Sequence, residues 1–496
     1  MKELIQLHPT DNVIIALRDF KAGERISFGN ETLTLTEDIP RRHKIALRDI
    51  AEGRQVIKYG FPIGHATTAI VKGGWVHTHN VKTNLKDTQT YEYRPKFAEH
   101  LFTDAPREVN IYRRKNGGAG IRNELWIIPT VGCVNAIGQR IMEAFLREAG
   151  PLSIDGVNVL THNYGCSQLG EDHANTRTIL QDTVKHPNAG GVLVLGLGCE
   201  NNQMAEFVKT LGDYDPKRVK FLVAQEAGDE IAAGKNLLLE LYAEMKNDKR
   251  EKASIAEISF GLECGGSDGF SGITANPMLG LFSDYVISQG GTTVLTEVPE
   301  MFGAETLLME RCKDRATFEK CVLLINNFKE FFLKNGQEIY ENPSPGNKRG
   351  GITSLEDKSL GCTQKSGGSP VADVLRYGET LKTKGLNLLS APGNDLVATT
   401  ALLAAGCQLV LFTTGLGNPY GGYGPTVKIS TNTQLYEKKP AWIDFDAGRL
   451  VTEDLTMEDL TREFIDYIVG VVNGERVCNE KNNFREIAIF KSGVTL

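Results

Sequence analysis

Residues 125–133 read LWIIPTVGC, an apolar run that ends in Gly-Cys, and the helical stretch VNAIGQRIMEAFLREAG follows at 134–150. The same succession recurs twice downstream, as VNVLTHNYGC before NTRTILQDTVKH and as GVLVLGLGC before ENNQMAEFVKTL. Apolar runs that alternate with helical stretches predict parallel βαβ units. We therefore predict an α/β fold built on a parallel sheet. Because glycine-rich segments follow these runs, we expect the functional site at the carboxyl edge of the sheet, where open α/β folds bind ligands.

The first 80 residues show a different pattern. Short alternating runs, NVIIALRDF and ETLTLTED, are separated by the turn signals AGE, GNE and AEG, and this predicts a small β-rich module. Residues 81–120 lack a clear period and are rich in charge and tyrosine. We assign them to a linker that leads into the main body.

Composition narrows the class of protein. The chain has 496 residues, of which 41% are hydrophobic and 24% charged, and this is typical of a globular protein of several domains. The net charge of -7 argues against a nucleic-acid partner. No apolar stretch has the length of a signal peptide or a membrane span, so we expect a cytoplasmic protein with no membrane partner. The nine cysteines should then be mostly reduced.

Three cysteines occupy equivalent positions in the repeated pattern. Cys133, Cys166 and Cys199 each follow a glycine at the end of an apolar run, at intervals of 33 residues, and Cys264 in GLECGG has the same placement. If the strands are parallel neighbours, these thiols share one sheet edge near helix N-termini, where a thiolate is favoured. This predicts a soft-ligand metal site, for iron or for an iron–sulfur cluster. The alternative is that Gly-Cys is only a tight strand-to-helix turn, and the absence of a CxxC pair weakens ferredoxin-like and zinc-ribbon interpretations.

Four loops combine glycine with charged or amide groups, at 261–277, 342–368, 390–396 and 413–426. None matches a phosphate-binding or dinucleotide-binding glycine pattern. A carboxylate substrate needs cationic and amide donors, whereas a hard divalent cation needs carboxylates. The candidate substrate-binding residues are Arg122, Thr274, Asn276, Asn347, Lys348 and Asn394. The candidate carboxylate ligands are Asp268, Glu297, Glu356 and Asp395, which compete with the thiol set Cys133, Cys166, Cys199 and Cys264. Each loop alone is also compatible with a solvated surface turn.

Several of these segments together resemble a known family. GIRNELWIIPTVGCVN, THNYGCSQLGEDH, GLECGGSDGFSGITANPMLG, ENPSPGNKRGGIT, LEDKSLGCTQK and SAPGNDLVAT are similar to blocks of the altronate and galactarate dehydratases, a family that also holds sulfolactate sulfo-lyase. The resemblance covers essentially the full length. It implies an N-terminal β-clip (SAF-type) module at 1–80, a linker at 81–120, a middle α/β domain for dimerisation at 121–250, and a Rossmann-like catalytic domain at 251–496.

The resemblance also implies the activity. It implies dehydration of a sugar acid, D-altronate, to 2-keto-3-deoxy-D-gluconate in hexuronate catabolism, by a homodimer that depends on Fe²⁺ or Mn²⁺ under reducing conditions. Such a reaction needs a base at carbon 2, an acid for the hydroxyl at carbon 3, and positive charge near the enediolate. We expect His162 or Lys365 as the base, with the other, or His173, as the acid. Alternatives are galactarate or sulfolactate as substrate, an iron–sulfur hydratase, and a non-enzymatic sugar-acid sensor.

Overall fold

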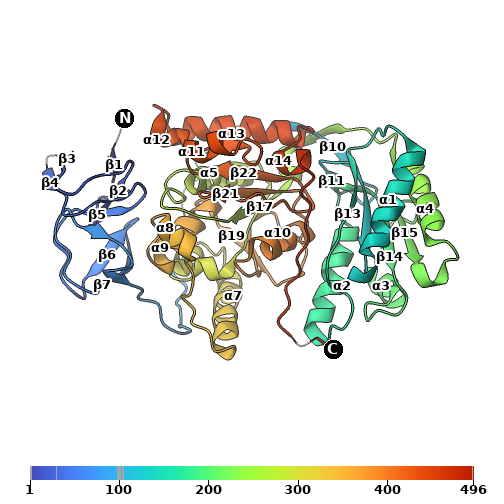
Figure 1. The fold of residues 1–496 in the computed structure, drawn as a ribbon, viewed down its shortest axis with the longest axis horizontal. Coiled ribbons are helices and arrows are strands. Elements are labelled where there is room, and N and C mark those ends of the chain that lie inside the picture. Colours follow the sequence, from blue (N-terminus) through green and yellow to red (C-terminus); the bar gives the residue numbers. More distant parts are fainter. Residues whose placement is uncertain (1–2, 30, 98–101, 103–104, 494) are drawn as a thin grey trace.

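The computed structural model describes residues 3–29, 31–97, 102, 105–493 and 495–496. Figure 1 shows the N-terminal β-rich module at one end, a large sheet with its helices in the centre, and a second, smaller parallel sheet at the other end. The predicted α/β fold with a parallel sheet and an N-terminal β module is confirmed. Among the described residues no helix is both long and apolar enough to span a bilayer.

The strands that the structure describes in the N-terminal module, residues 3–29 and 31–82, all pair antiparallel. One sheet has the order β1-β2-β5-β8, and two smaller sheets have the orders β3-β4 and β6-β7-β9. The strands are β1 (Leu4–Ile5), β2 (Val13–Ala16), β3 (Arg25–Phe28), β4 (Glu31–Thr34), β5 (Lys44–Ala46), β6 (Gln55–Lys58), β7 (Phe61–Ala66), β8 (Trp75–Val76) and β9 (Val81–Lys82). Ile14, Ile45 and Val56 are buried in this module, while turn residues of the type predicted from AGE and AEG connect the strands.

Two buried lysines attach this module to the main body. Lys44 and Lys58 each place their Nζ atom 2.8 Å from a different oxygen of Asp357, which lies in helix α9 (Leu355–Cys362). Lys44 also donates to the Gly351 carbonyl, and the Thr353 amide donates to Asp357. Buried charges are tolerated when each is paired and hydrogen-bonded. The module therefore holds the helix that carries the sequence EDKSLGC.

Replacing Asp357 with alanine is expected to lower the free energy of unfolding by about 3–5 kcal/mol, because two buried ammonium groups lose their counter-ion. The lysines hold the pKa of Asp357 well below its usual range although burial alone would raise it. The stabilisation should therefore be present above about pH 4 and be lost as the pH falls further. Denaturant unfolding at neutral pH measures the effect. Glu31→Gln, which breaks the exposed pair with Lys72, should change the free energy by less than about 1 kcal/mol. Equal losses for both variants would contradict this role of Asp357.

A four-stranded parallel sheet of order β13-β12-β14-β15 forms the middle region. Its strands are β12 (Glu124–Pro129), β13 (Gly156–Val159), β14 (Ala189–Gly196) and β15 (Val219–Val223). Its helices are α1 (Asn135–Ala149), α2 (Gly170–Val184), α3 (Met204–Leu211) and α4 (Glu230–Met245). Leu125 and Ile127 pack in the core shared with α1 and α4, whereas Trp126 and Ile128 pack in the core shared with α2 and α3. Both faces of β12 are thus buried, which explains why LWII is a continuous apolar run.

Two strands of a small antiparallel sheet lie in the stretch 81–120 that was assigned to a linker. Strand β10 (Glu108–Arg113) pairs with β11 (Ala119–Gly120) and with β16 (Glu251–Ser254), which follows the middle region in sequence. The segment EVNIYR alternates, with Val109 and Ile111 fully buried, but the run is short and lies among charged residues, so no strand was predicted there. Residues 108–113 are therefore part of the packed body.

The central sheet has seven parallel strands in the order β19-β20-β18-β17-β21-β22-β23. They are β17 (Ser259–Cys264), β18 (Thr292–Leu295), β19 (Val371–Leu375), β20 (Gly385–Leu389), β21 (Leu409–Thr414), β22 (Thr426–Ser430) and β23 (Phe445–Asp446). Strands β18, β20 and β19 lie on one side of β17, and β21, β22 and β23 lie on its other side, so the chain reverses its direction of strand addition at β17. Such a reversal separates the loops at the carboxyl ends and leaves room for a ligand.

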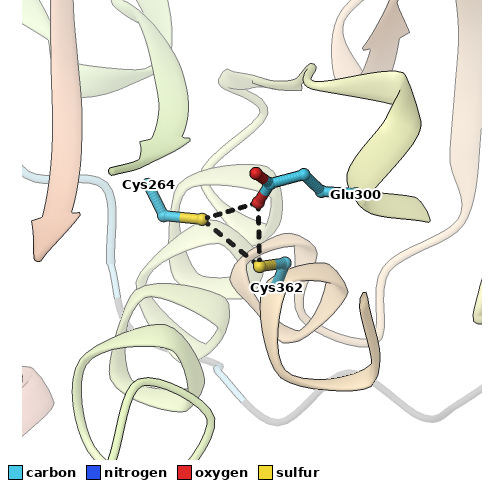
Figure 2. A group of neighbouring side chains, drawn as sticks. All are labelled: Cys264, Glu300 and Cys362. Atoms are coloured by element: carbon cyan, nitrogen blue, oxygen red, sulfur yellow. Dashed lines mark hydrogen bonds between the residues drawn. The ribbon is translucent and has the colours of Figure 1, made fainter. Parts of the chain in front are cut away.

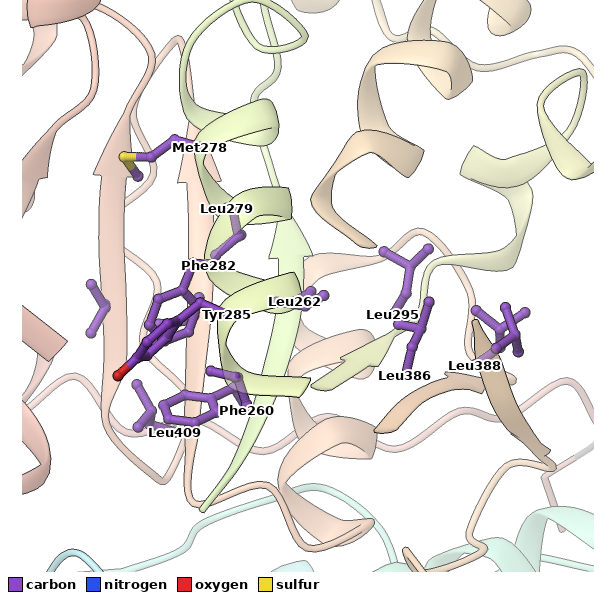
Figure 3. Packing of buried hydrophobic residues seen from close by; sticks show 14 of the residues in the cluster. Phe260, Leu262, Met278, Leu279, Phe282, Tyr285, Leu295, Leu386, Leu388 and Leu409 are labelled. Carbon is purple, nitrogen blue, oxygen red and sulfur yellow. The ribbon is translucent and has the colours of Figure 1, made fainter. Parts of the chain in front are cut away.

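Helices cover this sheet. Figure 3 shows Met278 and Phe282 of α5 above Phe260 and Leu409 of the strands, all of them buried. The longer helices are α5 (Ala275–Ser288), α7 (Arg315–Lys334), α10 (Asp395–Ala404) and α13 (Met457–Val472). The shorter ones are α6 (Glu305–Met309), α8 (Pro345–Arg349), α11 (Thr433–Lys438), α12 (Arg449–Thr452) and α14 (Cys478–Lys481). Helix α10 also packs against α2, so it joins the central and middle regions.

Candidate active site at the carboxyl edge of the central sheet

Neighbouring strand ends bring acidic side chains together at the carboxyl edge. Glu263 and Cys264 end β17, and Glu297 follows β18 in a left-handed backbone conformation with φ of 65°. Glu300 lies in the 3₁₀ turn after it, and Asp395 is the first residue of α10. Because β17 and β18 pair in parallel, these residues reach one edge from two adjacent strands.

Cys264, Glu300 and Cys362 form a compact buried group, shown in Figure 2. The two Sγ atoms are 3.3 Å apart, and Glu300 Oε2 lies 3.4 Å from Cys264 Sγ and 3.1 Å from Cys362 Sγ. Helix α9 delivers Cys362 and also Lys358, whose ammonium group donates to Glu300 Oε1 at 2.6 Å. This group offers two thiols and one carboxylate oxygen to a single point.

Glu263, Glu297 and Asp395 form a second group, whose carboxylate oxygens lie within 4.8 Å of one another. Lys365, in the turn after α9, donates to Glu297 Oε2 at 2.8 Å, and the Cys264 amide donates to the same oxygen at 3.0 Å. Both oxygens of Glu263 and Oε1 of Glu297 are buried without a hydrogen-bond partner. Buried acceptors of this kind are costly unless a proton or a cation binds there.

The electrostatics of the second group fit that requirement. Burial, together with Glu297 and Asp395, raises the pKa of Glu263 well above its usual range. Burial raises the pKa of Glu297 to about 7 although Lys365 opposes the shift, and burial with Glu300 raises the pKa of Asp395 to about 6. Three like charges this close cannot all ionise without compensation. The group therefore has a strong preference for protons or for a divalent cation.

The two lysines of the site, Lys365 and Lys358, stabilise charge where the carboxylate group disfavours it. Burial alone would lower the pKa of Lys365, but Cys264 and Glu297 outweigh it and raise this pKa well above its usual range. Burial alone would raise the pKa of Glu300, but Lys358 and Lys365 outweigh it and lower that pKa. Lys365 is therefore a fixed cation that holds its proton, and it is unsuited to act as a resting base.

Both acidic groups fit a transition metal by their donor chemistry. The unpartnered oxygens of Glu263 and Glu297 suit a hard ion such as Mn²⁺, while the two thiols with Glu300 suit a softer ion. Fe²⁺ accepts both kinds of ligand. The two groups adjoin through the Cys264 amide and Glu297, so they belong to one site.

Four residues of this candidate site are among those predicted from the sequence. Lys365, Glu297, Asp395 and Cys264 lie in it, while Glu263, Glu300, Cys362 and Lys358 were not among the predicted site residues. A glutamate inside the apolar run SFGLEC was the available signal for Glu263, because an acidic residue in a fully buried strand needs a reason.

The two predicted metal-ligand sets need correction. Cys264 contacts Cys362 and Glu300 in the central sheet, whereas Cys133, Cys166 and Cys199 follow strands of the middle sheet, so the four thiols do not form one site. The Gly-Cys pattern was right for each strand end, but it cannot tell which strands share a sheet.

In the carboxylate set, Glu356 accepts from Thr83 and from the Asn84 amide. Asp268 accepts from Thr431, Ser271 and the Phe270 amide. Glu356 and Asp268 are thus hydrogen-bonded elsewhere and are not part of the carboxylate group that contains Glu297 and Asp395.

Arg122 is also a correction among the substrate-binding candidates. Its guanidinium is 1% exposed, binds Glu480 with 2.7 Å from Nε to Oε1, and donates to the Ile121, Val471 and Glu475 carbonyls. No donor remains for a substrate, and the residue instead ties the middle region to the C-terminal helices.

The other substrate-binding candidates lie closer to the site. Asn347 donates to the Ser267 carbonyl and accepts from Lys358 at 3.3 Å, and Asn276 bonds the Gly361 carbonyl and Thr413. Thr274 donates to the Phe270 and Thr431 carbonyls. Lys348 is half-buried on α8, and the exposed Asn394 caps α10 next to Asp395. Their role in binding stays a prediction.

The predicted histidines lie in the middle region. His162 donates from Nε2 to the Pro129 carbonyl at 2.7 Å, and its Nδ1 accepts from the Tyr164 amide. Burial lowers the pKa of His162 and of the half-buried His173 in α2. Both ring nitrogens of His162 thus bond backbone groups of the middle region, whereas Lys365 bonds Glu297 beside the central sheet, and the assignment of the two as base and acid stays a prediction.

A cavity of about 680 Å³ lies elsewhere, between the middle sheet and the β10 region. Arg114, His186 and Arg218 line it, and none of the site residues does. We identify the site by its side-chain chemistry and not by cavity volume. Buried carboxylates without hydrogen-bond partners, next to buried lysines, are rare outside functional sites, whereas open grooves are common.

Comparison with known proteins assigns the chain. Family models match residues 2–84 (altronate/galactarate dehydratase SAF domain), 111–246 (D-galactarate dehydratase/altronate hydrolase, second domain) and 255–495 (D-galactarate/altronate dehydratase, C-terminal). The chain is 62% identical to an altronate dehydratase of Escherichia coli and 59% identical to one of Bacillus subtilis, with 100% of both chains covered in each comparison. It is 32% identical to a galactarate dehydratase (L-threo-forming) of Escherichia coli, covering 95% of this chain and 93% of that one. The chain belongs to the altronate and galactarate dehydratase family.

Proposed function

We propose that this chain is a hydro-lyase that converts D-altronate to 2-keto-3-deoxy-D-gluconate and water. The observation that carries the proposal is the full-length identity of 62% and 59% to two altronate dehydratases, against 32% to a galactarate dehydratase. The buried acidic site at the strand reversal supports the same chemistry, since removal of a proton beside a carboxylate needs nearby bases and fixed positive charge.

We also propose that the site holds Fe²⁺ or Mn²⁺. Glu263, Glu297 and Asp395 would hold it, or Cys264, Glu300 and Cys362 would, because each group converges on one point. A divalent cation, when bound, supplies charge that stabilises the enediolate formed from the substrate carboxylate.

The side chains divide the proton transfers between them. If Cys264, Glu300 and Cys362 hold the cation, the other three carboxylates are free for proton transfer. Asp395 is the least buried of them, so we assign it as the base that takes the proton from carbon 2. The freed electron pair forms the double bond between carbons 2 and 3, and the bond from carbon 3 to its hydroxyl oxygen breaks. Lys365 is protonated at rest, and it donates its proton to that oxygen because a leaving hydroxide is a much stronger base than an amine, so that water leaves. The enol product then tautomerises to the 2-keto acid.

An anaerobic assay with D-altronate and with galactarate, with and without added Fe²⁺, tests the proposal. We expect faster turnover of altronate and stimulation by iron. Faster turnover of galactarate would move the chain to the other branch of the family, and no turnover of either acid would favour a sensor. An iron–sulfur hydratase would need Cys133, Cys166 and Cys199 for turnover, whereas this proposal needs the acidic site of the central sheet.

The acidic site makes the stability of the metal-free protein depend on pH. The pKa values of Glu297 and Asp395 are raised to about 7 and about 6, so their contribution is fully present below about pH 4 and lost as the pH rises through 6 and 7. Mn²⁺ competes with these protons, so it should raise the melting temperature of chelator-treated protein more at about pH 8 than at about pH 5.5. Differential scanning fluorimetry measures both effects. Asp395→Asn should reduce the difference, and equal shifts at both pH values would argue against cation binding at the carboxylates.

We further propose a cytoplasmic homodimer. All nine cysteines are free thiols, although Cys264 and Cys362 lie 3.3 Å apart, and this supports a reducing compartment. The family resemblance supports dimerisation through the middle region, where Leu146 of α1 is 40% exposed. Light scattering of the purified chain should give twice the monomer mass of 54.4 kDa, and a monomeric mass would reject the dimer.

A further inference from the structure

We infer that Cys133, Cys166 and Cys199 hold an iron–sulfur cluster in the middle region, at a site separate from the acidic site of the central sheet. The inference does not depend on the proposed function, because it rests on the geometry of the middle sheet alone. These three residues are the exposed cysteines of the chain, and the other six are buried.

Strand pairing places the three thiols at one sheet edge. Strand β12 lies between β13 and β14 and pairs in parallel with both. Cys133 follows β12, Cys166 follows β13 and Cys199 follows β14. Each loop leads from a carboxyl strand end toward the start of α1, α2 or α3, where the helix dipole favours negative charge such as thiolate.

Hydrogen bonds join the three loops directly beside the cysteines. The Gly132 amide donates to the Tyr164 carbonyl at 2.9 Å, and the Asn202 amide donates to the Gly165 carbonyl at 3.0 Å. The Ser167 amide donates to Asn201 Oδ1 at 2.7 Å. Each cysteine is therefore one to three residues from a bond to the neighbouring loop, and the three loops form one rim.

The glycines before the cysteines permit this close approach. A Cβ atom on Gly132 would lie 2.7 Å from the His162 carbonyl oxygen, and one on Gly165 would overlap the Thr130 carbonyl. Gly165 also has a φ of 99°, which other residues rarely adopt. The backbone is thus tightly packed beside these cysteines, which are themselves exposed.

The spacing favours a cluster over a single ion. One tetrahedral ion with Zn–S or similar bonds of about 2.3 Å would need its sulfurs about 4 Å apart. Among the described residues, two groups have three ligand atoms within 4.8 Å of one another, and neither contains Cys133, Cys166 and Cys199. At least two of these three sulfurs are therefore more than 4.8 Å apart. A cubane cluster places iron and sulfide atoms between its cysteine ligands and so fits a wider triangle.

An unpartnered amide donor near the thiols supports a bound group there. Gln168 Nε2 is buried and lacks a hydrogen-bond partner, and the residue is 7% exposed. Amide donors near a cluster bind its sulfides and tune it. With three cysteines, the fourth iron would be left for a ligand that is not a cysteine of this site.

Anaerobic reconstitution with ferrous iron and sulfide tests the inference on the full-length chain. We expect a brown protein with broad visible absorbance that retains iron and acid-labile sulfide in equal amounts after desalting. Cys133→Ser/Cys166→Ser/Cys199→Ser should lose the colour and the sulfide. The matched variant Cys264→Ser/Cys362→Ser, with thiols of the central sheet removed, should retain both.

Several outcomes would overturn the inference. They are a wild-type protein that retains no acid-labile sulfide, a triple variant that retains as much as wild type, and tight binding of ferrous ion by the three thiols without sulfide. Because the triple variant can lose sulfide by misfolding, its circular dichroism is compared with wild type, and Cys199→Ser alone serves as a milder variant. Cys199→Ser in a folded protein should lower retained sulfide at least severalfold, and full retention would also count against the cluster.

Discussion

Lys365→Met is expected to lower altronate turnover by about 10²–10⁴-fold, the range typical for loss of a positioned acid or base. Lys365 is 1% exposed and is bound to Glu297 at 2.8 Å, beside Cys264. Its removal takes away the proton assigned to the leaving hydroxyl. It also leaves the carboxylate group without its nearest fixed cation, so the transition state loses electrostatic stabilisation as well.

A matched variant separates this effect from loss of stability. Lys329 is also fully buried and pairs with Glu305 at 2.9 Å, in the same domain but outside the site. Lys329→Met should cost a comparable amount of stability, about 3–5 kcal/mol, yet the turnover per folded molecule should stay near that of wild type. Turnover by Lys365→Met equal to that of Lys329→Met, corrected for the folded fraction, would remove Lys365 from the chemistry.

Cys362→Ser is expected to have the second large effect, on metal content and turnover together. The thiol lies 3.3 Å from Cys264 Sγ and 3.1 Å from Glu300 Oε2, so it is central to one of the two ligand groups. Since loss of supporting partners alone typically costs 10–100-fold in metal affinity, loss of a ligand should cost at least about 100-fold. Elemental analysis of anaerobically purified protein and an Fe²⁺ titration of activity measure the change.

The control for this variant is Cys312→Ser. Cys312 is equally buried in the hydrophobic core, and its thiol bonds the Leu308 carbonyl outside the two ligand groups. It should keep wild-type iron dependence. If Cys362→Ser keeps wild-type iron content while Asp395→Asn loses it, the cation belongs to the carboxylate group and the thiols have another role.

Part of the fold and of the site was accessible from sequence because the signals are local. The run LWIIPTVGC predicts a buried parallel strand with a tight turn, and β12 with its following 3₁₀ turn at Gly132–Val134 confirms this. Alternating runs before residue 80 predict antiparallel β structure, which the module has. Lys365, Glu297, Asp395 and Cys264 were found because polar groups in glycine-rich loops after strands mark the carboxyl edge.

The remaining site residues depend on contacts between distant segments. Cys362 is brought to Cys264 across 98 residues, and α9 that carries it is held by Lys44 and Lys58 of the N-terminal module. Arg122 was predicted as a substrate ligand from its charge, but its guanidinium forms a buried ion pair with Glu480, which is distant in the sequence. No local pattern contains such pairings.

The sequence alone determined that this protein is built from parallel βαβ units behind a small β module, because side-chain periodicity and turn chemistry act over a few neighbouring residues. Only the tertiary structure decided which Gly-Cys strand ends share a sheet. Cys133, Cys166 and Cys199 stand on one sheet and Cys264 stands on another, because strand neighbours are chosen by burial of whole faces against remote helices, and the four local sequences look alike at this level.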